Sequence, residues 1–319
     1  MTTSSTAGQG GRRRWFPRWA TVLISIGSMA IVVYLLGRSG KEILLQLSRI
    51  DMGFMFAGLG LGALATLSGF LSFSRILSPM LDTPMSFGRL GHLHFTGQML
   101  KHLPGRVFGI AYQIGAGNEA SSSAWISANA LHILLTLYTA CIVSAGVLLW
   151  SRYPVTASLV VVLGVLGWFA VLRSPLLHRL AGKSSRLEGR FVGLARSLAS
   201  SVARLEARDH LRIMGWMMLS WLVYFLAWAF YGLAVASMGA GDGILMCAHY
   251  NLAWIVGYIT LVTPSGIGVR EGAFMAMGGA FSPSELAYGV LVGRVSLLLI
   301  DLFLSLLFLP FHGTANEPG

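Results

Sequence analysis

The sequence predicts an all-α integral membrane protein, and three observations lead to this class. The chain is 55% hydrophobic and only 11% charged, whereas soluble globular chains carry about 25% charged residues. Several uninterrupted apolar runs approach or exceed the ~20 residues that a helix needs to cross a bilayer. The basic residues are concentrated in segments that flank these runs, which is typical of membrane proteins. No soluble fold accounts for this combination.

The net charge of +11 does not indicate nucleic-acid binding, because of where the charges lie. Nine of the 23 lysines and arginines lie between Arg173 and Arg212, and four more precede residue 19. Placing the N-terminus and residues 173–211 in the cytoplasm puts most basic side chains inside, as the positive-inside rule requires. We therefore expect a multi-pass protein of the inner (plasma) membrane with both termini in the cytoplasm.

Six apolar segments are predicted to be ordinary transmembrane helices. They cover residues 20–37, 52–74, 122–150, 155–172, 213–237 and 285–309. A single membrane domain, 20–310, is expected between a disordered basic tail, 1–19, and a cytoplasmic tail, 311–319. Residues 173–211 form a cytoplasmic connection in which apolar residues recur at steps of three and four. This connection is either an amphipathic helix on the membrane surface or a connector packed on the other helices.

Two further apolar stretches are broken in the middle. Residues 85–118 break at Pro104-Gly105, and residues 243–281 break around Pro264. Each stretch is either a re-entrant hairpin or a Pro-kinked span. Each also follows one span and precedes another, with an offset of about half the chain, and the two begin from opposite sides of the membrane. The pattern predicts an inverted repeat with eight membrane segments in total, an architecture common in secondary transporters.

The residues at the two breaks suggest an anion site. A half-helix that begins just after each break would point free backbone N–H groups at a ligand, and Arg106 and Arg270 would add positive charge. The predicted substrate-binding residues are Pro104, Gly105, Arg106, Pro264, Ser265, Gly266, Gly268, Arg270 and Glu271.

Ionisable residues in apolar segments are candidates for function by default. Arg294 and Asp301 are seven residues apart, on one helical face, and are predicted to form a charge network in which Glu271 neutralises Arg270 or Arg294. Histidines 92, 94 and 102 match no zinc spacing, so they are interpreted as interfacial and no metal is expected. Asn129 with His132, and His249 with Asn251, are expected to form hydrogen bonds between helices.

No enzyme signature is present in the sequence. A nucleotide-binding loop in a strand–helix context, a Gly-x-Ser-x-Gly elbow and a His-Glu-x-x-His motif are all missing. We therefore expect no catalytic residues, no enzymatic activity and no cofactor.

The two breaks also carry a family resemblance. Residues 263–272, Thr-Pro-Ser-Gly-Ile-Gly-Val-Arg-Glu-Gly, resemble the P-G-G-x-G-x-R-E-G motif of the lysylphosphatidylglycerol synthase transmembrane region, a flippase-like membrane domain. Residues 103–109, Leu-Pro-Gly-Arg-Val-Phe-Gly, resemble the L-P-G-R-x-G element of the same family. Ser265 stands where the family commonly has glycine. The resemblance extends from about residue 20 to 310.

The resemblance implies a lipid-handling membrane domain of the cell envelope. In bifunctional members this domain precedes an aminoacyl-transferase domain, and because this chain ends at Gly319 we expect a stand-alone member without lysyl transfer. The expected function is binding or translocation of an anionic lipid or lipid-linked saccharide in envelope lipid and glycolipid metabolism. The alternative is a non-catalytic scaffold subunit for a glycosyltransferase or another lipid-modifying enzyme. Expected partners are a membrane lipid, such an enzyme and a second copy of the chain, with no nucleic acid.

Overall fold

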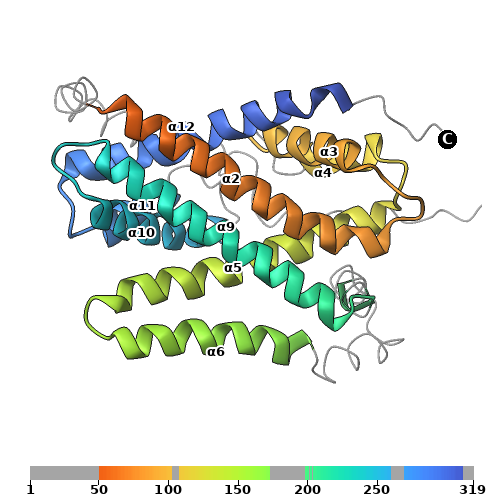
Figure 1. Cartoon of the computed structure of the whole chain (residues 1–319), viewed down its shortest axis with the longest axis horizontal. Coiled ribbons are helices and arrows are strands. Elements are labelled where there is room, and N and C mark those ends of the chain that lie inside the picture. Colours follow the sequence, from red (N-terminus) through yellow and green to blue (C-terminus); the bar gives the residue numbers. More distant parts are fainter. Residues whose placement is uncertain are drawn as a thin grey trace, which may run out of the picture.

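The fold is described by a computed structural model that covers residues 50–102, 108–172, 198–200, 202, 204–259 and 269–311. Within these residues the secondary structure is entirely helical (Figure 1). The all-α class is therefore confirmed. The predicted span 20–37, the N-terminal tail, residues 312–319 and most of the connection 173–211 lie outside the described residues.

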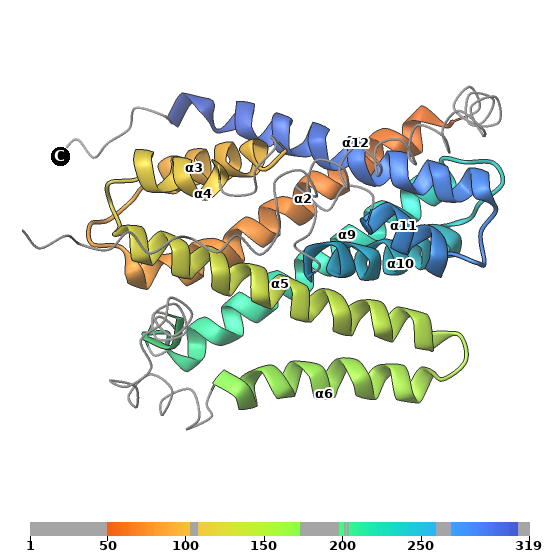
Figure 2. The same ribbon diagram turned by 180° about the vertical axis from the view of Figure 1, so that it is seen from behind.

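Five of the predicted spans coincide with helices. In chain order the helices are α2 (Met52–Leu77), η1 (Ser78–Met80), α3 (Phe87–Leu100), α4 (Phe108–Ala116), α5 (Ser122–Trp150), α6 (Pro154–Leu172), α9 (Ala207–Leu233), α10 (Ala240–Ile259), α11 (Val269–Met277), α12 (Pro283–Leu307) and η3 (Leu309–Phe311). Of these, α2 with η1, α5, α9 and α12 are long and apolar enough to cross a membrane. Helix α6 is a shorter apolar helix that lies along α5 in both views (Figures 1 and 2).

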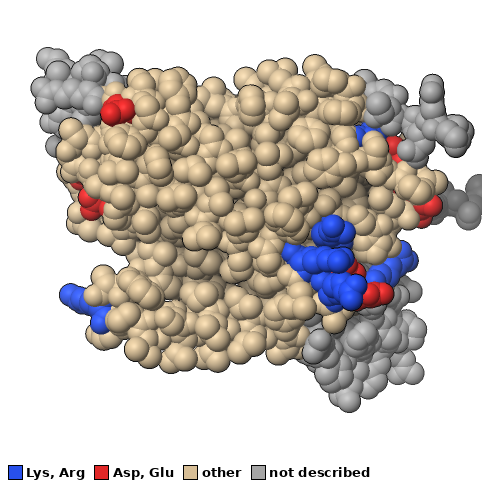
Figure 3. Space-filling view, viewed as in Figure 1, with Lys and Arg blue, Asp and Glu red and all other residues tan. Residues whose placement is uncertain are grey.

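The surface of the molecule fits a bilayer. Large apolar side chains such as Phe56, Val155 and Leu222 are exposed at 64%, 73% and 69%. In the view of Figure 3 a broad uncharged band covers the middle, and Lys, Arg, Asp and Glu gather towards the two ends. Exposure of this apolar band to water would cost free energy, whereas contact with lipid tails does not.

Helix α9 begins at Ala207. The hydropathy pattern had predicted a later start, near residue 213. The Glu206 backbone N–H donates to the Asp209 carboxylate at 3.3 Å, which fixes the first turn. A side chain that caps the orphan N–H groups of a helix start extends the helix beyond its apolar part. The last five residues of the predicted connection, 207–211, therefore belong to α9.

Helices α2 and α9 form a long antiparallel pair at the centre of the bundle. The Asp51 N–H donates to the Ala234 carbonyl at 2.9 Å at one end. Further along, Ser220 Oγ donates to the Ala65 carbonyl at 2.8 Å. Gly58 has no side chain, so the ring of Tyr231 of α9 packs directly against the backbone of α2. Because α2 and α9 run in opposite directions, the elements that follow them start from opposite ends of the molecule.

The first broken stretch folds back on itself as an antiparallel hairpin of α3 and α4. Gln113 Nε2 donates to the Leu93 carbonyl at 3.5 Å, and His92 bonds with Tyr112 at 2.9 Å. Near the break the helices touch at a glycine, because a Cβ on Gly109 would collide with the backbone of α3 at residue 97. Glycine permits this approach because it has no side chain.

The second broken stretch is also an antiparallel hairpin, made of α10 and α11. The rings of Tyr250 and Phe274 lie 5.5 Å apart. Near the break Gly257 faces Arg270, whose Cβ would lie 3.0 Å from a Cβ at Gly257. Both broken stretches therefore reverse direction, which the sequence left open.

The two hairpins lie in opposite halves of the molecule in both ribbon views (Figures 1 and 2). Each one packs against the long helix that follows the other. Helix α3 contacts α12, where the rings of Phe95 and Phe308 are 5.0 Å apart, and α10 contacts α5. Four long helices thus hold the two break-proximal ends near the middle of the bundle.

Candidate functional site

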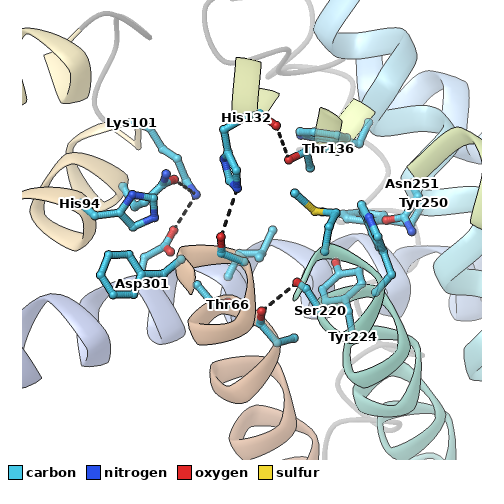
Figure 4. A pocket seen from close by; sticks show the side chains of 18 of the residues that line it. Thr66, His94, Lys101, His132, Thr136, Ser220, Tyr224, Tyr250, Asn251 and Asp301 are labelled. Atoms are coloured by element: carbon cyan, nitrogen blue, oxygen red, sulfur yellow. Dashed lines mark hydrogen bonds and ion pairs between the residues drawn. The ribbon is translucent and has the colours of Figure 1, made fainter. Parts of the chain in front are cut away.

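A cavity of about 220 Å³ lies where the two hairpins approach each other. It is lined from α2, α3, α5, α9, α10, α11 and α12. In Figure 4, His94, Lys101 and Asp301 lie on one side and Tyr224, Tyr250 and Asn251 lie on the other. Both hairpins contribute charged groups to this cavity, so it is the candidate site.

Asp301 of α12 holds the end of the first hairpin. Its carboxylate is 2% exposed and accepts hydrogen bonds from Lys101 Nζ at 2.9 Å and His102 Nε2 at 2.8 Å. Lys101 also donates to Gln98 Oε1 at 2.9 Å. A buried carboxylate needs such partners because burial removes its hydration. The pair joins residues that are about 200 positions apart in the sequence.

Glu271 of α11 joins the second hairpin to α12. Its Oε1 accepts from Arg294 Nε at 2.9 Å and from Arg294 Nη2, and the Arg270 Nε–H donates to the same oxygen at 3.4 Å. Arg270 and Glu271 are both buried, at 7% and 5% exposure. Glu271 therefore forms ion pairs with both Arg270 and Arg294, the two arginines that the sequence suggested it neutralises.

The two members of the predicted charge network, Arg294 and Asp301, both form ion pairs, but not with each other. The two residues share a face of α12, but Arg294 contacts Glu271 and Asp301 contacts Lys101 and His102. Each therefore ties a different hairpin to α12. Arg270 and Asp301 line the cavity, whereas Glu271 and Arg294 are not among its lining residues.

Arg270 has hydrogen-bonding capacity left over. Its Nη2 is buried and has no hydrogen-bond partner in the part of the chain that the structure describes. The guanidinium carbon lies 4.7 Å from the centre of the Tyr250 ring, which supports the cation from one side. A buried donor without a partner costs about 1–3 kcal/mol, so a ligand acceptor would be stabilising here.

Four aromatic side chains line the cavity on α9 and α10. They are Trp221, Tyr224, Tyr250 and Trp254. Trp221 Nε1 donates to Thr139 Oγ1 at 2.8 Å, so its only polar atom is already satisfied. The rings of Trp221 and Tyr224 pack edge to face at 5.8 Å. This group is the aromatic wall of the cavity.

Hydroxyl groups occupy other parts of the lining. Thr66, Thr136 and Ser220 each donate to a backbone carbonyl, at 2.9, 2.7 and 2.8 Å. Because each hydroxyl proton is used in this way, the oxygen can only accept further hydrogen bonds from a group in the cavity. The lining thus combines cationic donors with neutral acceptors.

His92 and His94 are buried between helices, whereas the sequence suggested an interfacial position for both. His94 is 3% exposed and packs against Phe73 with ring centres 4.6 Å apart, and His92 is 2% exposed. Their surroundings are set by helix packing, which the local sequence does not reveal. No group of His, Cys, Asp and Glu among the described residues has the arrangement of a metal site.

The predicted hydrogen bonds between helices are found in one of the two pairs. Asn129 Nδ2 donates to Gln113 Oε1 at 2.8 Å, and His132 Nε2 lies 3.2 Å from the Gly69 carbonyl. In contrast, His249 bonds to a carbonyl of its own helix. His132 also lines the cavity.

Most of the predicted break residues cannot be placed. Pro104, Gly105 and Arg106, and likewise residues 264–266 and Gly268, lie outside the described residues. Their role at half-helix starts stays a prediction. The Lys101–Asp301 ion pair and the aromatic wall were not predicted from the sequence, although Lys101 lies just before the first break.

These features define a class: a multi-pass α-helical membrane protein with two helical hairpins around an internal charged cavity. A family model described as the lysylphosphatidylglycerol synthase TM region matches residues 18–305. The chain therefore belongs to this family, as the break motifs suggested. No curated protein and no solved structure matches the chain.

Proposed function

We propose that the protein binds an anionic lipid by its head group in the cavity and carries it between the two leaflets. The observation that supports this most directly is Arg270, a buried arginine in the cavity whose Nη2 lacks a partner among the described residues. A phosphate is acceptor-only and doubly or singly negative, so it satisfies both the donor and the charge.

The charge balance around the cavity favours an anion. The two clusters contain three cationic side chains, Lys101, Arg270 and Arg294, and two carboxylates, Glu271 and Asp301. Among the described residues of these clusters, one positive charge is left without a carboxylate. In a low-dielectric interior such an excess is costly, and a ligand with one negative charge offsets it.

The arrangement of the helices supports an inverted repeat with membrane re-entrant hairpins. Helices α4 and α11 have nine residues each, or roughly 13 Å at 1.5 Å per residue, too short for a hydrocarbon core of about 30 Å. The antiparallel α2 and α9 send the two hairpins in from opposite ends. We propose that the two triplets rock about the cavity so that it opens alternately to each leaflet.

The exposed arginines support the proposed orientation in the inner membrane. Arg75 closes α2, and Arg204, Arg208 and Arg212 surround the start of α9. Because α2 and α9 are antiparallel, these residues lie at the same end of the molecule, whereas Arg152 lies at the α5–α6 turn. The arginine-rich end faces the cytoplasm under the positive-inside rule. The proposed role is not enzymatic.

Binding of a long-chain alkyl phosphate to the purified full-length protein tests the site. We expect Arg270→Gln to weaken binding about tenfold or more, the loss of one charge-assisted hydrogen bond. Glu271 keeps its bonds to Arg294 in this variant, so folding is preserved. Arg152→Gln, which removes an exposed arginine at a helix turn, is the matched control and should bind normally. Unchanged affinity in Arg270→Gln would refute the site.

Proteoliposomes test the transport step. With a fluorescent anionic lipid and a membrane-impermeant quencher, the wild type should expose inner-leaflet lipid faster than Arg270→Gln. Binding without any translocation, together with co-purification of a lipid-modifying enzyme, would instead favour the scaffold alternative.

A further inference from the structure

We propose that the head group bound in the cavity is a single sugar ring carrying the phosphate, so that the ligand is a lipid-linked monosaccharide. This inference rests on the proposed function and narrows it. It is carried by the aromatic wall and by the acceptor oxygens of the lining, neither of which a phosphate uses.

The aromatic wall brings four aromatic rings to the lining of the cavity. Trp221 uses its N–H on Thr139, and its edge-to-face contact with Tyr224 fixes both rings. Trp254 stands near Tyr258 with ring centres 5.5 Å apart. A sugar ring has an apolar face of C–H groups with partial positive charge, which packs against the negative face of an aromatic ring. Arg270 rests on Tyr250 of the same wall, so a phosphate at Arg270 would place the attached sugar beside these rings.

The acceptor oxygens require a ligand that donates hydrogen bonds. The oxygens of Thr66, Thr136 and Ser220 present lone pairs, since their protons go to backbone carbonyls. Phosphate oxygens cannot donate to them. Sugar hydroxyls can, and several lie on one ring.

An amine-bearing head group fits less well. The Asp301 carboxylate is already paired with Lys101 and His102, and Glu271 is paired with two arginines. The cavity region has an excess of positive charge, which repels an ammonium group. Hydroxyl donors therefore match the lining better than ammonium donors do.

The size of the cavity favours one sugar ring over several. Drug-sized ligands occupy sites of about 300–1,000 Å³, whereas this cavity measures about 220 Å³. One ring and its phosphate match this size, and an oligosaccharide does not. The lipid chain then lies outside the cavity.

The test compares matched ligands on the full-length protein in detergent–lipid micelles. The probes are a long-chain alkyl phosphate and its glucosyl, galactosyl, mannosyl and N-acetylglucosaminyl phosphodiesters. We expect at least one glycosyl probe to bind about tenfold tighter than the bare phosphate. Equal affinity for all probes, or tighter binding of phosphatidylglycerol than of every glycosyl probe, overturns the inference while leaving the anion site intact. Absence of binding by every anionic probe refutes the proposed function itself.

Variants of Trp254 separate sugar recognition from phosphate recognition. Trp254→Leu should weaken binding of the glycosyl probe much more than binding of bare alkyl phosphate, so that the preference is lost, and Trp254→Phe should restore most of the preference. Arg270→Gln should weaken both probes alike. Trp150→Leu, which alters a tryptophan that is 61% exposed at the end of α5, is the control. A preference that survives in Trp254→Leu contradicts the role of the wall.

Discussion

The two helical hairpins are tied to α12 by ion pairs of opposite polarity. At the first hairpin α12 supplies the carboxylate, Asp301, and the hairpin supplies the cation Lys101 and the imidazole of His102. At the second hairpin α12 supplies the cation, Arg294, and the hairpin supplies Glu271. Among the residues that the structure describes, only the second hairpin has a further buried cation, Arg270. The comparison teaches that one tie is used up in holding the fold, whereas the other leaves a donor for a ligand.

The largest effect is expected from Glu271→Gln. This change leaves Arg270 and Arg294 close together without a carboxylate, and a buried charge that loses its partner costs about 3–5 kcal/mol. The thermal unfolding temperature of the protein in detergent should fall strongly. Asp82→Asn, at an exposed carboxylate, should change little. If the two variants melt together, the second tie does not stabilise the fold.

A smaller effect is expected from Gly109→Ala in the first hairpin. The new methyl group would collide with the backbone at Gly97, and such overpacking costs about 1–3 kcal/mol. Gly115→Ala is the control on the same helix, because a Cβ there meets nothing within 4 Å. It should be neutral or slightly stabilising. Equal melting temperatures for the two variants would contradict the close contact of α3 and α4.

The smallest loss of stability is expected from Asp301→Asn. Lys101 is 41% exposed and His102 is 29% exposed, so both can reach water once the carboxylate is gone, at a cost of about 1–2 kcal/mol. Binding of alkyl phosphate should be retained or strengthened, since the cavity loses a negative charge. A loss of binding as large as that of Arg270→Gln would show that both hairpins hold the ligand.

The sequence predicted those parts of the fold that depend on local pattern. The long spans follow from apolar length, and proline and glycine in the middle of two apolar stretches marked the breaks, although they did not decide between a reversal and a kinked span. The start of α9 was placed too late, because the Glu206–Asp209 cap lies outside the apolar run. Hydropathy detects burial in lipid, but it does not detect capping.

The candidate site was predicted only in part. Arg270 and Glu271 were identified because charge in an apolar segment is unusual. The partners of Asp301 were not identified, because helical spacing relates Asp301 only to Arg294 whereas tertiary packing brings it to Lys101 and His102. The aromatic wall was not predicted, since Trp221 and Tyr224 are ordinary residues of an apolar helix until α10 is placed beside them.

Helix α12 also acts as a molecular ruler. Arg294 and Asp301 are seven residues apart, so the two ties are separated by about 10 Å along one rigid axis. The hairpin ends are held at this interval, and the span of the space between them follows from it. The side chains that tie the two hairpins to α12 are therefore spaced by the rise of a single helix, and of the two only Asp301 lines the cavity.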